Sequence, residues 1–214
     1  MDTNQIHNNS LRDFLLCELS RHTFLSLHHL RRARILFTQL HTQPVNVHKA
    51  EFWYATELTL FHLGFVSRYL FPAKDCKRDQ LIATEIRVLL DISDDSILAD
   101  RSLRNGMEHY DERIEKWHKE QPEGAFFLYC IAPSQFFNQT HHQNMHWIID
   151  SKRGNLHFWN KSINLVETYN ILRALLSKLY PHRPIYYDFG DSAYKSLIEE
   201  HLPPPPPSPR PTGS

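Results

Sequence analysis

Two long stretches in the first third of the chain repeat apolar residues at steps of three and four, and this period constrains the fold most. Such spacing places the apolar residues on one face of an α-helix. In residues 11–40 the series is Leu16, Leu19, Leu27, Leu30, Ala33, Phe37 and Leu40. In residues 47–71 it is Phe52, Ala55, Leu58, Phe61, Phe65 and Tyr69. Because Pro72 ends the second series, the sequence predicts two long amphipathic helices.

Two further helices are predicted before residue 121. A short one over residues 78–91 has Leu81, Ile82, Ile86 and Leu89 as its inward face. The next begins at Asp94 and Asp95, whose carboxylates suit the positive end of a helix, and continues to Lys119. Its apolar stripe, at steps of four and three, is Leu103, Met107, Tyr110, Ile114 and Trp117.

The pattern changes after Pro122-Glu123-Gly124. Residues 125–132 and 145–149 read as extended, and residues 156–159 follow the turn at 150–154, which predicts a β-hairpin plus one more strand. A helix over 164–179, an extended piece at 185–187 and a helix starting at Asp191 follow. The fold class expected is mainly α, a four- to five-helix bundle followed by a small α+β segment. We expect the chain to have three parts: a helical domain over residues 1–121, an α+β segment over 122–202 packed on that domain, and a disordered, proline-rich tail over 203–214.

Charge and cysteine content limit the classes of function. Lys+Arg and Asp+Glu both number 24, so there is no chain-wide basic field, and any phosphate binding must be local. Cys17, Cys76 and Cys130 are an odd number without a CxxC pair, which favours a reducing compartment. No signal peptide or membrane-spanning stretch is visible. We therefore expect a cytoplasmic protein that does not contact a membrane.

The fourth predicted helix gathers polar residues on the side opposite its apolar stripe. At 100° per residue that side carries Arg101, Arg104, Asn105, Glu108, His109 and Glu112. The plain interpretation is a solvated face with ion pairs at i,i+3 and i,i+4 spacing. Gly106 favours a binding or contact role over a merely solvated face, because glycine costs about 1 kcal/mol inside a helix and permits close approach of a ligand or backbone.

The string Arg104-Asn105-x-x-x-His109 resembles the motif of the HEPN superfamily, in which an arginine followed by a polar residue precedes a histidine by four to six residues. The longer string RNGMEHYDER is similar to a HEPN-like group of uncharacterised bacterial proteins. The resemblance covers residues 10–120, and the helices before the motif agree in kind with a four- or five-helix HEPN bundle. The β-containing part that follows lies outside the usual HEPN core.

The resemblance implies a metal-independent endoribonuclease without a cofactor, active as a homodimer that brings two motifs together through the motif helix. His109 would then be the general acid or base, Arg104 would stabilise the phosphorane, and Asn105 would position the phosphate or a partner. Glu112 would orient the imidazole, with Arg101 in support. Glu108 would repel the RNA phosphate unless Arg101 or Arg104 neutralises it.

Two alternatives to catalysis stay open. Many HEPN domains serve as binding modules, and zero net charge gives little non-specific affinity for RNA, so the same face could instead mediate dimerisation or bind a nucleotide or protein partner. The motif helix could also be no more than a salt-bridged surface.

Other candidate sites have weaker patterns. His141, His142 and His146 with Asn144 lack a carboxylate or cysteine at metal-ligand spacing, so we expect no metal. Cys17 stands among apolar helical residues, as a buried and inert thiol would. The aromatic segments 52–54 and 126–129 fit core packing better than base stacking. The tail at 203–211 suits either a proline-recognising partner or a flexible end.

Overall fold

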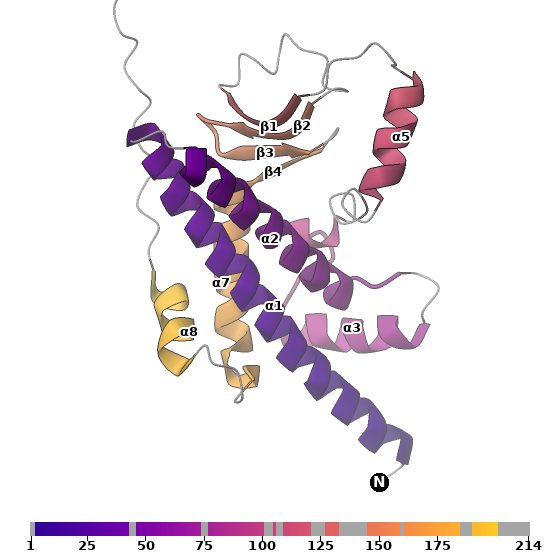
Figure 1. The fold of residues 1–214 in the computed structure, drawn as a ribbon. Coiled ribbons are helices and arrows are strands. Elements are labelled where there is room, and N and C mark those ends of the chain that lie inside the picture. Colours follow the sequence, from indigo (N-terminus) through magenta and orange to yellow (C-terminus); the bar gives the residue numbers. More distant parts are fainter. Residues whose placement is uncertain are drawn as a thin grey trace, which may run out of the picture.

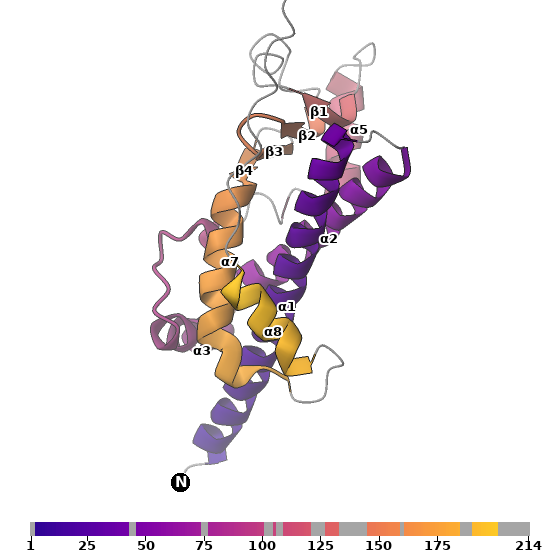
Figure 2. The ribbon, with the colours of Figure 1, turned by 90° about the vertical axis from the view of Figure 1, so that its left-hand side faces the viewer.

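Helix α1 (Thr3–Thr42) is the longest element, and the other helices are arranged along it (Figures 1 and 2). The computed structural model describes residues 3–42, 46–73, 77–100, 105, 109–120, 127–132, 145–158, 161–184 and 190–200. Helix α2 (Asn46–Leu70) returns along α1, and α7 (Leu165–Leu179) and α8 (Gly190–Glu199) pack on α1 as well. Helix α3 (Lys77–Leu89) contacts both α1 and α2 and lies near the C-terminal end of α2 (Figure 1). The described chain is therefore mainly helical, as predicted.

Small hydroxylated residues let α1 and α2 approach closely. The Ser26 hydroxyl on α1 donates to the Thr59 carbonyl oxygen on α2 at 2.9 Å, and both residues are fully buried. Thr59 and Thr56 in turn donate to the carbonyl oxygens one turn back in α2, those of Ala55 and Phe52, at 2.8 Å. These bonds satisfy hydroxyls that would be costly to bury without a partner. The hydroxyls of Ser26, Thr56 and Thr59 can therefore be buried between α1 and α2 without loss of their hydrogen bonds.

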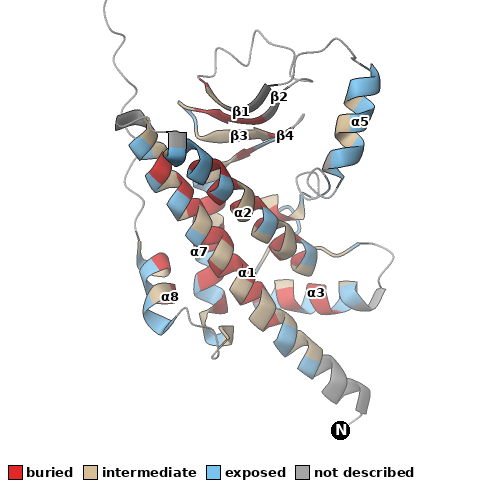
Figure 3. Cartoon of the chain, viewed as in Figure 1, coloured by how far each residue is buried: buried red, intermediate tan, exposed pale blue. Residues whose placement is uncertain are grey.

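One hydrophobic core extends across residue 121. Its buried members on α1 include Leu19, Leu27 and Leu36, which share the cluster with Leu172 and Leu176 of α7. Leucines on both sides of the predicted boundary are therefore removed from water by each other (Figure 3). The 122–202 segment does pack on the helical part, whereas its separation as a domain of its own stays a prediction.

A four-stranded mixed sheet lies at one end of the helices (Figure 1). Its strands, in spatial order, are β1 (Phe127–Ala132), β2 (Met145–Asp150), β3 (Asn155–Phe158) and β4 (Lys161–Asn164). β2 and β3 form the predicted hairpin, whereas β1 pairs parallel to β2. β4 was not predicted, because its one buried apolar residue, Ile163, gives no alternating pattern.

Helix α7 begins where the sequence predicted. The Asn164 side chain accepts hydrogen bonds from the backbone N–H groups of Val166 and Glu167 at 3.0 and 2.9 Å, and so caps the helix. α8, with Asp191 in its first turn, is confirmed too. The extended piece at 185–187 and the tail at 203–214 lie outside the described residues.

Two predicted inward faces are partly wrong. Phe61 of α2 is 51% exposed, and Leu81 and Leu89 of α3 are 58% and 56% exposed. The buried face of α2 runs instead through the hydroxyls and small residues described above, which an apolar periodicity does not count as core. On α3, Ile82 and Ile86 are buried as expected.

The predicted continuous helix over 94–119 is also wrong. Residues 97–99 form a 3₁₀ turn, η1 (Ile97–Ala99), and Asp100 after it is extended, with φ −70° and ψ 107°. Helix α5 (Tyr110–Glu120) begins ten residues later. Ser96 caps η1 by accepting from the Leu98 N–H, a local bond that competes with a longer helix. No helix in the described ranges is long and apolar enough to cross a membrane.

We predict that removing buried side chains on either side of residue 121 destabilises the whole chain. Leu27→Ala and Leu176→Ala, both fully buried, should each lower the free energy of unfolding by about 2–5 kcal/mol in a single cooperative transition. Val88→Ala is the control, because Val88 is 76% exposed and its loss should cost less than about 0.5 kcal/mol. Urea denaturation followed by circular dichroism measures each change. Two separate transitions, with each variant affecting one, would show two independent domains.

Candidate functional site

The residues of the predicted site lie at the start of α5 and in the segment before it. Asn105 is helical and exposed, and its carbonyl oxygen accepts the His109 backbone N–H at 3.2 Å. His109 then leads into α5, where its carbonyl oxygen accepts the Arg113 N–H at 3.1 Å. Asn105 and His109 are therefore one helical turn apart. Arg101, Arg104 and Glu108 lie outside the described residues.

His109 is paired with Glu112. Its Nδ1 lies 3.3 Å from Glu112 Oε2, and the two side chains are 55% and 73% exposed. Because the carboxylate can only accept, a hydrogen bond within this pair would be donated by Nδ1 and would leave Nε2 to face a bound molecule. The structure thus brings His109 and Glu112 together at i,i+3 spacing, whereas their role in a site stays a prediction.

Helix α5 stands apart from the bundle formed by α1, α2 and α7 (Figure 1). Its apolar residues Ile114 and Trp117 are only half-buried, so they are not core residues as predicted. The other members of the predicted stripe, Leu103, Met107 and Tyr110, have no described side chains. The helix carrying the candidate site is therefore covered little by the rest of the described chain.

Ion pairs along α5 balance its charge. Lys119 Nζ lies 2.7 Å from Glu115 Oε1, and Lys116 Nζ lies 3.8 Å from Glu120 Oε1. These lysines therefore add little positive potential for an RNA backbone.

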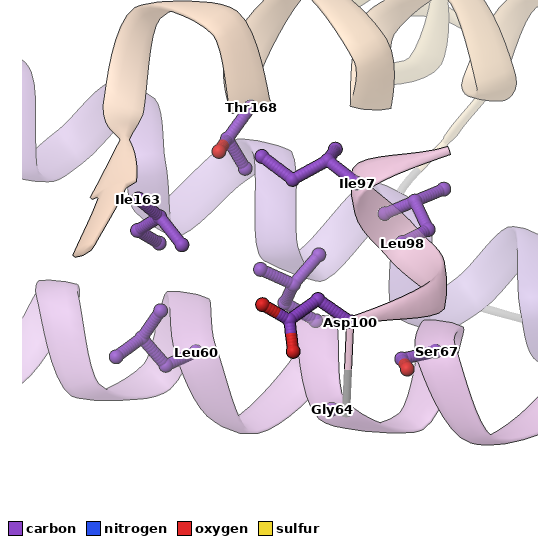
Figure 4. Close-up of a pocket in the computed structure, with 9 residues that line it drawn as sticks. Leu60, Gly64, Ser67, Ile97, Leu98, Asp100, Ile163 and Thr168 are labelled. Atoms are coloured by element: carbon purple, nitrogen blue, oxygen red, sulfur yellow. The ribbon is translucent and has the colours of Figure 1, made fainter. Parts of the chain in front are cut away.

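A cleft lies where the chain leaves η1 toward the motif (Figure 4). It is small and partly open to solvent. Asp100 lines it beside apolar residues and Ser67, whose buried hydroxyl has no hydrogen-bond partner in the described part of the chain. The residues that line it come from α2, η1, β4 and α7: Leu60, Leu63, Gly64, Ser67, Ile97, Leu98, Asp100, Ile163 and Thr168. The mostly aliphatic lining offers no nucleophile and no acid–base pair.

The remaining sequence candidates do not form a site in the described residues. Cys17 is half-buried, and burial raises the pKa of its thiol, as for an unreactive cysteine. Phe52 and Trp53 are core residues at 1% and 5% exposure, whereas Tyr54 is 64% exposed. His141, His142 and Asn144 lie outside the described residues, as does the His146 side chain. No three His, Cys, Asp or Glu side chains within the described ranges are placed to hold a metal ion.

Sequence reasoning missed a histidine cluster in the seam between α1 and α2. His22 on α1 is 3% exposed, and its Nδ1 lies 2.9 Å from Nδ1 of His62 on α2. The rings of His62 and His29 are stacked 5.8 Å apart. The one available signal was that His22 follows Leu19 by three residues, inside the apolar stripe of the first helix. The positions of the histidines along the sequence do not reveal that these three lie together in the fold.

The different exposure of these histidines predicts different reactivity toward diethyl pyrocarbonate. His109, half-exposed, should be carbethoxylated rapidly, whereas His22 should react at least about tenfold more slowly because it is buried. Peptide mass spectrometry over a time course measures both rates in one sample. Equal rates in native buffer would contradict the burial of His22, and equal rates in urea are the control for intrinsic reactivity.

Comparison of the chain with protein-family models, with curated proteins and with solved structures found no match. The HEPN resemblance therefore depends on the residues of the motif alone. Function has to be argued from the site itself, and here from the pairing of His109 with Glu112 on an exposed helix.

Proposed function

We propose that the segment 101–112 is an RNA-cleaving site of the HEPN type that works without a metal or cofactor. The observation that carries the proposal is the His109–Glu112 pair, in which a carboxylate orients an exposed imidazole. An imidazole held through Nδ1 presents Nε2 to its substrate, and such orientation is a recurring part of general acid–base catalysis.

In the proposed reaction, His109 Nε2 takes the proton of a ribose 2′-hydroxyl or gives one to the leaving 5′-oxygen. The 2′-oxygen attacks the adjacent phosphorus while the bond to the leaving oxygen breaks. Arg104 neutralises the charge that develops on the phosphorane, and Asn105, one turn before His109, holds a phosphate oxygen or the partner motif. In the helical projection of the sequence Glu108 falls on the same side as His109, so the proposal needs Arg101 or Arg104 to offset its charge.

The test measures cleavage of end-labelled mixed-sequence RNA by the full chain in EDTA. Wild type should cleave, and His109→Ala and Arg104→Ala should each lower the rate by about 10²–10⁴ because an acid–base or charge-stabilising group is lost. His118→Ala is the matched control, since His118 is an exposed histidine of the same helix that lies outside the motif. Cleavage that all variants share equally would belong to a contaminant, and absence of cleavage by wild type would overturn the proposal.

A second function, dimerisation through α5, is favoured by the half-buried Ile114. This residue lies on a helix that stands away from the bundle (Figure 1). Apolar side chains of this kind are commonly covered fully at a subunit contact. We propose a homodimer in which two copies of α5 meet along the face that carries Ile114.

Light scattering after size exclusion tests the dimer independently of RNA cleavage. Wild type should have twice the chain mass, and Ile114→Glu should be monomeric because it places a charge in the contact. Lys116→Glu changes the charge of α5 at an exposed position and should remain dimeric. A wild-type monomer at high concentration would refute dimerisation while leaving the cleavage assay as a separate question.

A further inference from the structure

Hydrogen bonding fixes which nitrogens of the buried histidine pair carry protons. Arg21 Nη2 lies 2.9 Å from His22 Nε2, and a guanidinium only donates, so His22 Nε2 is the acceptor. A neutral His22 then carries its proton on Nδ1 and donates it to His62 Nδ1 at 2.9 Å. The His62 proton is thereby placed on Nε2. The result is a directed chain from α1 to α2 that requires both imidazoles to be neutral.

Packing holds this chain in place. The His22 ring stacks on Phe65 of α2 at 4.3 Å between centroids and 16° between planes. His62 lies against Phe61, and the ring of Tyr69 is 5.9 Å from that of His22. His22 is almost completely buried, so it cannot exchange its bonds for water without separation of the two helices.

Charged and titratable groups from both helices face the pair: Arg21 opposes the protonation of His22, whereas Glu18 favours it. Arg21, Glu18 and His29 face it from α1, and Tyr69 and Arg68 lie near it on α2. Glu18 is the carboxylate of this group, but both of its oxygens are held by Arg21, at 3.1 and 2.6 Å. Its Oε2 lies 3.9 Å from His22 Nε2, too far for a hydrogen bond. Burial, with Arg21 next, lowers the pKa of His22 to about 4. Burial, with His22 and His29 next, lowers the pKa of His62 to about 4.

We propose that the His22–His62 pair is an acid-sensitive latch that holds α1 against α2 and opens when either imidazole is protonated. A proton on His22 Nε2 would point at the Arg21 guanidinium, and a proton on His62 Nδ1 would point at His22 Nδ1–H. Either event replaces a donor–acceptor contact by two donors at 2.9 Å. The opened seam exposes the α1–α2 contact, separately from the site at His109.

The direction of the pH effect follows from proton linkage. The folded-state pKa values are about 4, below the ordinary value of 6.5, so the unfolded chain binds more protons between these limits. The stabilisation is fully present above about pH 6.5 and is lost as the pH falls toward 4. For each histidine, the unfolding equilibrium constant should rise about tenfold or more between pH 7 and pH 5.

The experiment compares urea denaturation of wild type and His22→Phe/His62→Phe at pH 7 and pH 5. Phenyl rings keep the stacking on Phe65 and do not titrate, so the rise in the unfolding constant should be at least about tenfold smaller in the double variant. His118→Phe, at an exposed position on α5 away from the seam, is the control and should retain the wild-type acid sensitivity. Equal pH dependence of wild type and double variant would overturn the proposal.

A second measurement does not depend on the folding of a variant. In the ¹⁵N spectrum of wild type at pH 7, His22 should be the neutral tautomer with Nδ1 protonated, and His62 the one with Nε2 protonated. Hydrogen exchange should show faster opening of the α1–α2 seam at pH 5, after correction for the intrinsic rate. A protonated His22 Nε2 at pH 7, or an unchanged opening constant, would contradict the latch.

Discussion

The contact of α1 with α2 is the constraint on which the remaining structure depends. A 40-residue helix is about 60 Å long, far longer than a small core needs, and α1 is buried over its middle portion from Leu16 to Leu36. Different elements cover different parts of it: α2 along most of its length, α7 and α8 on another side, and α3 toward one end. These elements, which are remote from one another in the sequence, come together because each of them packs on α1.

Hydrogen bonds at the helix ends fix the elements that α1 gathers. Arg31 of α1 lies 2.9 Å from a Glu200 carboxylate oxygen, while Arg173 of α7 donates to the Glu200 carbonyl oxygen at 2.7 Å, which ties the end of α8 to both helices. Lys178 of α7 donates to the Leu90 carbonyl oxygen, just beyond α3, at 2.8 Å. Arg173 and Lys178 bond backbone carbonyls at or beyond helix ends, and Arg31 adds an ion pair, so these side chains set the register of helices that apolar packing alone would let slide.

The sequence predicted the elements better than the faces they bury. The spacing of apolar residues located α1, α2, α3 and α7, because their buried faces contain enough leucine and isoleucine to indicate a helix. It misplaced the inward side of α2, where Thr56 and Thr59 are buried and Phe61 is half-exposed, since hydroxyls that bond their own backbone count as polar in any pattern. The parallel pairing of β1 with β2 is set by distant contacts that no local pattern records.

The candidate site was predicted from a short sequence motif, and the described residues of that motif have the helical spacing expected of them. One turn of helix relates Asn105 to His109, and i,i+3 spacing relates His109 to Glu112, so both relations follow from the sequence once the segment is helical. The break at Asp100 could not be foreseen in the same way. It results from the Ser96 cap and from the packing of Leu98 in the core, which compete with continuation of the helix.

An exposed His–Glu pair is a weak basis for catalysis when it stands alone. A surface ion pair is worth about 0–1 kcal/mol, and water on every side weakens the field that would act on a phosphorane. Catalysis at His109 therefore needs a second surface to exclude water and hold Arg104 in place. In the proposed homodimer, the face of α5 that carries Ile114 would offer such a surface to another copy of the chain. The two proposed functions of α5 are thus physically linked, because the dimer contact would supply the enclosure that a single copy lacks.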